Sequence, residues 1–348
     1  MDKYNEENSR HKDENYEESN RQKRVRTFEK KRNVLLLIFT VFALLIVAVG
    51  CTYNIPGELT GAEGNAESVV DYVQDISEVS AGIGGESRTA EEIPFVNITE
   101  ADSSDLTITW AGMTEDELPE TENLMTMIRA AIDAFSAEGY STGFLLYDLN
   151  NGGGISYHAD EFYYSASAIK GPYVAWLVQA YPQAADLLYG TIQNTIQWSS
   201  NDDYGDLITS YGYSEFNNWA AGLGCFDIAI TGEWHPAVNA REFAMLWSSI
   251  YDYFMSESCD PDIRELYNGT LSSAIYETLG AQYTVYSKGG WIGEGLGTYY
   301  NVQNDAGIVM KGEDPYVLVI LSDAYGRLDL LDNLVAVLDS AHTYLTEN

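Results

Sequence analysis

The stretch Phe162-Tyr-Tyr-Ser-Ala-Ser-Ala-Ile-Lys170 opens a long helical block and carries the first sign of chemistry. Ser167 and Lys170 stand three residues apart, so on a helix their hydroxyl and ammonium groups lie on one face. Burial penalises the charged form of a lysine, which can then accept the proton of a serine. Lys170 has apolar neighbours and is one of only three lysines after residue 50, with Lys288 and Lys311. The pair therefore predicts an activated serine nucleophile.

Two further motifs follow in the same chain. Trp198-Ser-Ser-Asn201 lies on a helical stretch, and Lys288-Gly-Gly290 ends a predicted strand. The patterns S-x-x-K, S-x-N and K-x-G, in that order, resemble the serine β-lactamase and penicillin-binding-protein superfamily of serine hydrolases, in particular its class A-like members. The resemblance covers about residues 121–348. It extends to Asn239-Ala-Arg-Glu-Phe-Ala244, where Asn239 and Glu242 form a predicted capping box, and to Asn304-Asp-Ala-Gly-Ile-Val309.

The resemblance implies a role for each matching position. Ser167 is expected to be the nucleophile that forms an acyl-enzyme, with Lys170 as its proton acceptor and Ser199 as the proton relay to the leaving nitrogen. The expected substrate-binding residues are Asn201 for the acyl-side amide, Lys288 for the substrate carboxylate, Gly290 of the third motif, and Trp291, whose backbone N–H completes an oxyanion hole with that of Ser167.

Three departures from the family pattern modify these expectations. The interval from Ser167 to Ser199 is short, so a loop that walls the cleft is expected to be missing. Gly289 replaces the Thr or Ser whose hydroxyl helps to bind a β-lactam carboxylate. The omega loop is truncated and lacks the glutamate that activates the deacylating water, which leaves Glu233 as the candidate deacylation base. His158 and His235 are expected to be structural.

The pattern of elements predicts an α+β fold of the β-lactamase/transpeptidase type. Leu124, Ile128, Ala131, Ile132 and Phe135 recur at helical spacing over 121–137. Two strands at 143–147 and 154–158 are joined by a glycine-rich turn, a helical block spans 165 to about 280, and strands follow at 283–288, 299–310 and 316–321 before a helix at 328–345. We therefore expect a five-stranded antiparallel sheet with flanking helices and an all-helical lobe.

The N-terminal part predicts membrane attachment. Residues 34–49 are uncharged, and the stretch extends to 34–53, about the length of a membrane span. The basic cluster at 21–32 precedes it, so the positive-inside rule places the charged tail 1–33 in the cytoplasm and the domain outside the cell membrane. A lipoprotein anchored at Cys51 and a cleaved signal peptide are the alternatives. Residues 54–120, acidic and without periodicity, are expected to form a flexible stalk before a domain at 121–348.

Charge and cysteine content limit the partners and bound metals that can be expected of this chain. The chain has a formal net charge of −35, and residues 51–348 alone carry 8 Lys/Arg against 45 Asp/Glu, so nucleic acid is not an expected partner. No Cys/His motif predicts a metal site, and the resemblance implies no cofactor. Cys225 and Cys259 could form a disulfide outside the membrane or remain free.

These observations predict a membrane-anchored serine hydrolase or acyltransferase. Its expected substrates are amides that carry a carboxylate, namely D-Ala-D-Ala-type wall peptides, with β-lactam antibiotics as acylating mimics. Two alternatives remain: a true β-lactamase that deacylates through Glu233, and a catalytically weak wall-binding or scaffold protein on the same fold.

Overall fold

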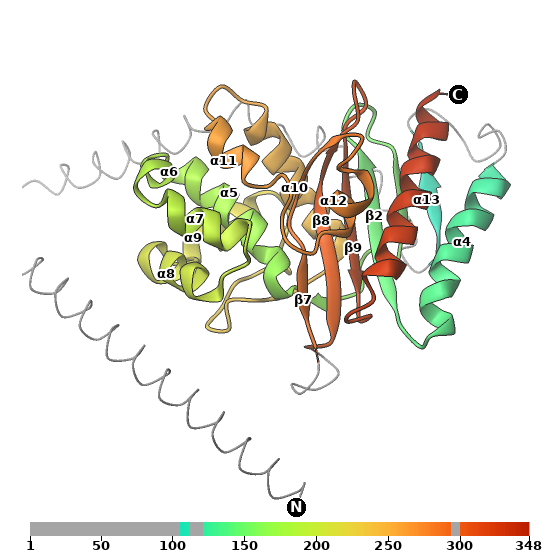
Figure 1. Ribbon diagram of the computed structural model, residues 1–348, viewed down its shortest axis with the longest axis horizontal. Helices are drawn as coiled ribbons and strands as arrows, with labels where there is room; N and C mark the ends of the chain where they lie inside the picture. The colour runs from blue at the N-terminus through green and yellow to red at the C-terminus, as the bar shows by residue number, and fades with distance from the viewer. Residues whose placement is uncertain (1–104, 111–120, 294–299, 348) are drawn as a thin grey trace, which may run out of the picture. The chain divides into compact units, whose positions relative to one another are not determined.

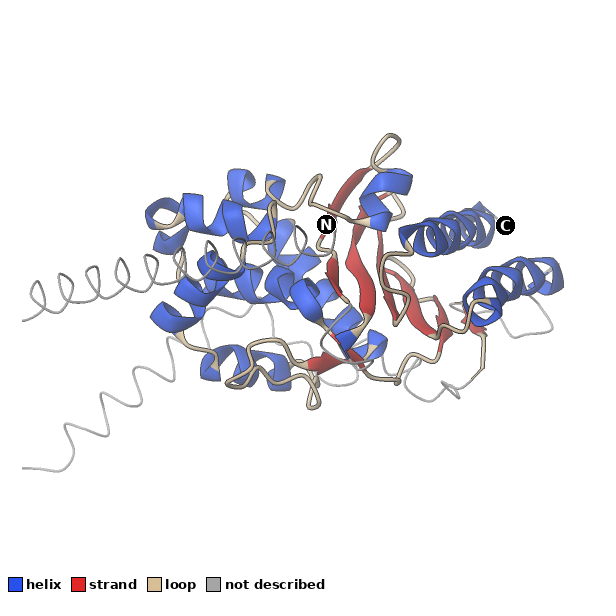
Figure 2. Cartoon of the chain, turned by 60° about the horizontal axis from the view of Figure 1, so that its bottom comes forward, coloured by secondary structure: helices blue, strands red, loops and turns tan. Residues whose placement is uncertain are grey.

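The computed structural model describes residues 105–110, 121–293 and 300–347. They form an antiparallel sheet with long helices on one face and a helical lobe on the other (Figures 1 and 2). The helices are α4 (Thr121–Ala137), α5 (Lys170–Ala180), α6 (Gln183–Leu187), α7 (Tyr189–Ile196), α8 (Asn201–Tyr211), α9 (Ser214–Gly222), α10 (Ala240–Phe254), α11 (Pro261–Glu265), α12 (Ala274–Leu279) and α13 (Leu328–Glu347), with a 3-10 turn η2 (Ala166–Ile169). The α+β architecture predicted from the sequence is confirmed.

The main sheet has seven strands among the described residues, in the order β1-β3-β2-β9-β8-β6, with β7 also paired to β8. The strands are β1 (Thr107–Thr109), β2 (Thr142–Asp148), β3 (Gly154–Tyr157), β6 (Thr284–Ser287), β7 (Gly290–Ile292), β8 (Val302–Met310) and β9 (Tyr316–Ser322). A separate two-stranded sheet pairs β4 (Tyr163–Tyr164) with β5 (Ala237–Val238).

The prediction of five strands is therefore corrected in two places. β6 and β7 both pair with β8, and Lys288 and Gly289 interrupt what is otherwise one edge strand. β1 pairs with β3 and comes from the range 54–120, which the sequence analysis assigns to the stalk. Leu106 and Trp110 on either side of β1 are buried, so residues 105–110 are part of the folded domain. The expected tail, the membrane span 34–53 and residues 54–104 lie outside the described residues. In the described part, no helix is long and apolar enough to span a membrane.

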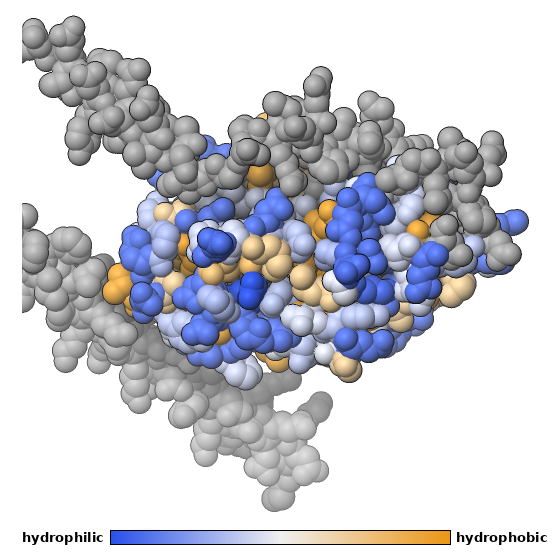
Figure 3. Space-filling model, turned by 90° about the horizontal axis from the view of Figure 1, so that it is seen from above, coloured by the Kyte–Doolittle hydropathy of each residue, from blue (hydrophilic) through white to orange (hydrophobic). Residues whose placement is uncertain are grey.

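Alternation along the central strands divides the core into two layers. Leu145 and Tyr147 of β2 point into the layer shared with α5 and α10, while Phe144 and Leu146 point toward α4 and α13. Successive side chains of a strand point to opposite faces, so a strand that is apolar at every position must be covered on both sides. In Figure 2 the sheet accordingly lies between α4 and α13 and the helical lobe. On the face seen in Figure 3, hydrophilic residues predominate, with apolar residues scattered between them.

Helix α5 is the central helix of the lobe. All its residues from Lys170 to Val178 are buried, as is typical of a helix that is apolar on every side. Gly171 permits this position, because a Cβ there would lie 2.9 Å from the Trp247 ring and 3.0 Å from Cβ of Lys288. The first turn of α5 thus lies directly against the start of the third motif.

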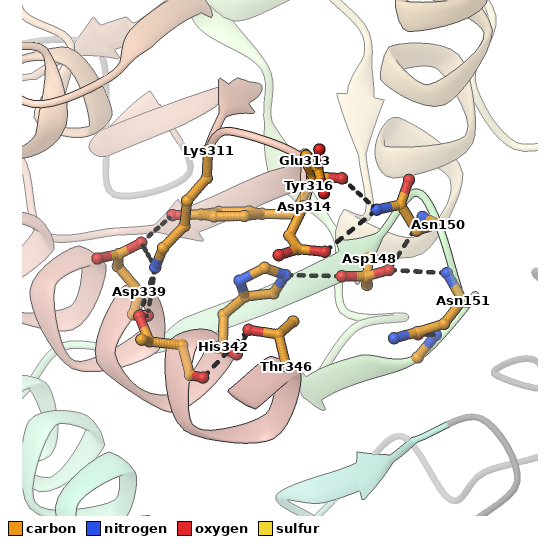
Figure 4. Close-up of polar contacts among 12 residues, drawn as sticks. Asp148, Asn150, Asn151, Lys311, Glu313, Asp314, Tyr316, Asp339, His342 and Thr346 are labelled. Carbon is orange, nitrogen blue, oxygen red and sulfur yellow. Dashed lines mark hydrogen bonds and ion pairs between the residues drawn. The ribbon is translucent and has the colours of Figure 1, made fainter. Parts of the chain in front are cut away.

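A buried polar cluster fastens α13 to the hairpin of β2 and β3 (Figure 4). Nε2 of His342 lies 2.8 Å from Oδ2 of Asp148, and both side chains are fully buried. The backbone N–H groups of Asn150 and Asn151 donate to the other oxygen of Asp148, at 2.9 and 2.8 Å. Burial acts to raise the pKa of Asp148, but these hydrogen bonds outweigh it and hold the pKa below its ordinary value.

The third lysine of the domain belongs to the same region. Nζ of Lys311 donates to Oδ1 of Asp339 at 2.5 Å and to Oγ1 of Thr343 at 2.5 Å, and Oη of Tyr316 donates to the same Asp339 oxygen (Figure 4). Lys311 therefore links the turn between β8 and β9 to α13. Its role is structural, unlike the roles expected of Lys170 and Lys288.

Replacing His342 by Leu should lower the free energy of unfolding by about 3 kcal/mol, because it leaves a buried carboxylate of Asp148 without its partner. Since the pKa of Asp148 is lowered by folding, this contribution is present above about pH 4 and is lost as the pH falls further. Urea unfolding of both proteins at pH 7 and pH 3 measures it. A difference below about 1 kcal/mol at pH 7, or one that grows toward pH 3, contradicts this assignment.

Gly290→Ala should destabilise the fold by about 1 to 3 kcal/mol, because β7 approaches η2 too closely for a side chain. A Cβ at Gly290 would lie 2.3 Å from the backbone N of Ala168 and 2.6 Å from the backbone O of Ser165. Gly190→Ala in α7 is the matched control: nothing lies within 4 Å of its Cβ, so stability should be unchanged or higher. Thermal unfolding compares the two variants. Equal melting temperatures would show that the close approach of β7 to η2 does not contribute to stability.

Candidate functional site

Ser167 lies on η2, the 3-10 turn that leads directly into α5. Side chains at i and i+3 of a 3-10 turn are eclipsed, which places the hydroxyl of Ser167 on the same side as the side chain of Lys170. Ala166, immediately before the serine, has a φ of 46°, a strained conformation for a residue with a side chain. Ser167 itself is half-buried, whereas its neighbours Ala166, Ala168 and Ile169 are buried. The turn thus presents the serine from an otherwise buried segment.

Lys170 is buried without a carboxylate among its hydrogen-bond partners in the described chain. Its Nζ donates to the backbone O of Ser199 at 2.7 Å and to Oδ1 of Asn201 at 2.6 Å. The Nζ also lies 5.6 Å from the ring centroid of Tyr204. Burial lowers the pKa of Lys170 to about 7, so a large fraction of the amine is neutral near neutral pH. A neutral amine next to a serine is the group that can take the hydroxyl proton.

Lys288 reaches the same residue from the other side. Its Nζ donates to Oγ of Ser199 at 3.1 Å and to the backbone O of Gly289 at 2.8 Å. Burial, with the charge of Lys170 as a second cause, lowers the pKa of Lys288 to about 7. Ser199 has a φ of 57°, which lets its carbonyl face one lysine and its hydroxyl the other. The backbone and side chain of one serine therefore join both lysines.

The structure thus brings four of the sequence-predicted residues into one hydrogen-bonded group: Lys170, Ser199, Asn201 and Lys288. Ser167 lies one turn from Lys170, but within the described residues its hydroxyl makes no hydrogen bond to either lysine. Hydrogen bonds of catalytic groups are often long without substrate and tighten in the complex, so this geometry is compatible with proton transfer. Gly290 and Trp291 lie on β7, which runs beside η2, so the N–H groups expected to form the oxyanion hole come from adjoining segments.

The position of Gly289 explains one departure from the family pattern. A Cβ on this residue would lie 2.4 Å from the backbone O of Ser272, and Ser272 itself has a φ of 53°. The loop before α12 therefore occupies the place of a side chain at this position. A Thr or Ser could enter only if that backbone moved, and its hydroxyl is not available here to bind a carboxylate.

Two residues of β8 that the sequence motifs did not place in the site lie next to it. Asp305 is fully buried and accepts hydrogen bonds from Oγ of Ser273 at 2.7 Å and from the backbone N of Ile275 at 2.9 Å. Burial raises its pKa to about 7, against the opposing effects of these hydrogen bonds and of Lys288. Asn304 donates from Nδ2 to the backbone O of Tyr164 at 2.8 Å, which ties β8 to the segment before the nucleophile. A consecutive Asn and Asp inside an apolar strand was the available signal for both.

Glu233 and His235 lie in different surroundings from those expected of their residue types. Glu233, the candidate deacylation base, has an exposed side chain. His235, expected to be structural, packs its ring 5.4 Å from Tyr204 and 6.2 Å from Tyr164, as measured between centroids. Burial and the nearby charge of Lys170 lower the pKa of His235 to about 4. His158, by contrast, stacks on Tyr157 and pairs with Glu161, and among the described residues no hydrogen bond joins it to either lysine.

Other features predicted from the sequence can be compared with the structure. Asn239 caps α10 by accepting from the backbone N of Glu242 at 2.8 Å, as expected. The carboxylate of Glu242 does not complete the capping box but accepts from the backbone N–H groups of residues 226–228. Cys225 and Cys259 are both buried and free. Within the described chain, no three His, Cys, Asp or Glu side chains are grouped in a way that could hold a metal ion.

Comparison with known proteins supports a β-lactamase-like fold. Residues 190–336 match the model of a family described as the beta-lactamase enzyme family, a range that contains Ser199 and Lys288 but begins after Ser167 and Lys170. A search of curated protein sequences finds no match.

Among solved structures, a beta-lactamase from Sphaerobacter thermophilus DSM 20745 has a TM-score of 0.54 and 17% identity, over 63% of this chain and 97% of that one. PBP-A has a TM-score of 0.51 and 18% identity, over 64% and 97%. A PBP-A variant, solved as its acyl-enzyme complex with penicillin G, has a TM-score of 0.51 and 17% identity, over 65% and 98%. The family match over residues 190–336 and the shared fold confirm the resemblance stated from the three motifs: this domain is similar in fold to serine β-lactamases and penicillin-binding proteins.

Proposed function

We propose that this protein is a serine acyl-enzyme hydrolase or acyltransferase that is acylated on Ser167. The observation that carries the proposal is the convergence of Lys170 and Lys288 on Ser199, with the pKa of each lysine lowered to about 7. A fold alone does not require two lysines buried beside one another, because burial and mutual repulsion both cost free energy. A catalytic site that needs an amine base does require a lysine with a lowered pKa.

The geometry supports a sequence of proton movements. Neutral Lys170 accepts the proton of Ser167 as its Oγ attacks the substrate carbonyl, and the N–H groups of Ser167 and Trp291 stabilise the oxyanion. The hydroxyl of Ser199, held by Lys288, delivers a proton to the leaving nitrogen and receives in turn the proton that Lys170 took from Ser167. The carbon–nitrogen bond then breaks, and an ester on Ser167 remains. Asn201, anchored by Lys170, is positioned to contact the acyl-side amide.

The proposed substrates are amides that carry a carboxylate, with D-Ala-D-Ala-type wall peptides as the natural class and β-lactams as mimics. Lys288 is the cation available to attract the carboxylate. The absent hydroxyl at Gly289 and the backbone of Ser272 beside it reduce the number of donors, so we expect weaker affinity for β-lactams than a Thr or Ser at this position would give. The PBP-A variant solved with penicillin G as an acyl-enzyme supports the use of penicillin as a probe.

We also propose that residues 34–53 anchor the chain in the cell membrane, with the hydrolase domain outside. The support is the uncharged stretch and the basic cluster before it. Wall peptides lie on that side of the membrane, so the proposed location agrees with the proposed substrate.

Fluorescent penicillin should label the wild-type protein with one adduct per chain. Ser167→Ala should give no adduct, and Lys170→Met should be acylated at least about 100-fold more slowly, because it lacks the base. The acylation rate of the wild type should fall as the pH drops below about 7, where Lys170 becomes protonated. Intact mass spectrometry and gel fluorescence measure the adduct.

An equal adduct on Ser167→Ala, or none on the wild type, contradicts the proposal. Binding of wall fragments without any acylation would instead favour the scaffold alternative. Lys311→Met is the matched control among the lysines of the domain, because Lys311 is bound to α13 outside the site. Its acylation rate should equal that of the wild type.

A further inference from the structure

Residues 234–237, which belong to the shortened omega loop, are held beside the nucleophile by hydrogen bonds from two directions. Tyr164 pairs with Ala237 in the small sheet, and the backbone N of Ser165 donates to the backbone O of Pro236 at 3.0 Å. From the helical lobe, Oη of Tyr204 donates to the backbone O of Trp234 at 3.1 Å. His235 lies between these two attachments. The loop therefore holds its histidine close to the segment that carries Ser167.

The imidazole of His235 shares its surroundings with Lys170. Its ring packs against Tyr204 and Tyr164, and Nζ of Lys170 lies over the same Tyr204 ring at 5.6 Å. The groups that face His235 are thus one amine from α5, one phenol from α8 and one phenol from β4. Glu233 contributes only its backbone from the loop itself. No carboxylate among the described residues is paired with this imidazole.

The protonation state of His235 suits a base. Because burial and the charge of Lys170 lower its pKa to about 4, the ring is neutral at pH 7. Nδ1 lies 3.4 Å from the backbone O of Glu233, and a carbonyl oxygen can only accept a hydrogen bond. This contact favours the tautomer with the proton on Nδ1. Nε2 then keeps its lone pair free to accept a proton.

We propose that His235 is the general base that deacylates the Ser167 ester, in place of the glutamate that the truncated loop lacks. The inference rests on the proposed acyl-enzyme function. Nε2 of His235 takes a proton from a water molecule as the water oxygen bonds to the acyl carbon. The tetrahedral intermediate then collapses, the bond from the acyl carbon to Oγ of Ser167 breaks, and Oγ receives the proton from the imidazolium. The products are a carboxylic acid and the free serine.

The two rival bases are less well placed. The side chain of Glu233 is exposed, and its backbone rather than its carboxylate meets His235. Lys170 is bound to the backbone O of Ser199 and to Asn201, and it is already assigned to the acylation step. A separate base for each half-reaction allows both steps to proceed near neutral pH.

The test follows the loss of label from the full-length acyl-enzyme. The protein is labelled with fluorescent penicillin, freed of excess reagent, and followed by gel fluorescence and intact mass from pH 4 to pH 9. His235→Gln should lose the label about 100-fold more slowly than the wild type, while its acylation rate stays within about two-fold. His158→Gln is the matched histidine control and should behave as the wild type. Imidazole added to His235→Ala should restore the loss of label.

The pH profile of the wild type separates the candidate bases without any variant that could misfold. With His235 as base, deacylation stays constant from pH 7 down to about pH 5 and falls near pH 4. A fall that begins near pH 7 assigns the step to Lys170 and overturns the inference. Equal rates in His235→Gln and the wild type, a loss of rate in Glu233→Gln alone, or a label that never leaves the wild type also overturn it. A wild type that takes up no label removes the proposed function itself.

Discussion

The central constraint in this domain is the burial of two lysines around one serine. Lys170 and Lys288 meet the carbonyl and the hydroxyl of Ser199, and each amine is kept from water and from a directly bonded carboxylate. Both charges cannot persist there at low cost, so the pKa of each amine falls toward neutrality. The carboxyl group of Asp305, whose own pKa is raised by burial, partly opposes the lowering of the pKa of Lys288. The rest of the fold provides the enclosure that this arrangement needs.

Glycines and backbone contacts produce that enclosure. Gly171 lets α5 lie against Lys288, and Gly290 lets β7 lie against η2, since a Cβ at either position would meet neighbouring atoms at 3.0 Å or less. Asn304 connects β8 to the residues before the nucleophile. The positive φ values of Ala166 and Ser199 occur at the two segments that bear the serines. Such strained residues concentrate at functional sites because the surrounding structure must hold them in place.

Much of the fold and of the candidate site could be predicted from the sequence. The remainder depends on contacts between residues that are far apart in the chain. Helical and strand periodicity located α4, α13 and the central strands, and the three motifs identified the hydrogen-bonded group around Ser199. Periodicity could not show that residues 107–109 add a strand, because three residues carry too little pattern. The position of His235 could not be predicted from the sequence either, because it depends on the pairing of Ala237 with Tyr164, more than seventy residues away in the chain. Glu233 was chosen by residue type, and only the fold shows that its side chain is exposed.

The most direct test of this account is the titration of the lysine side chains themselves. The chain has few lysines, so carbon-13 NMR of their Cε groups in the full-length protein can resolve them individually, with Lys170→Met and Lys288→Met to assign the signals. We expect two signals to titrate near pH 7 and to be the ones that are lost in the two variants. If Lys170 and Lys288 instead titrate near the ordinary lysine value of about 10.4, burial does not lower their pKa values, and Lys170 cannot act as the base at neutral pH.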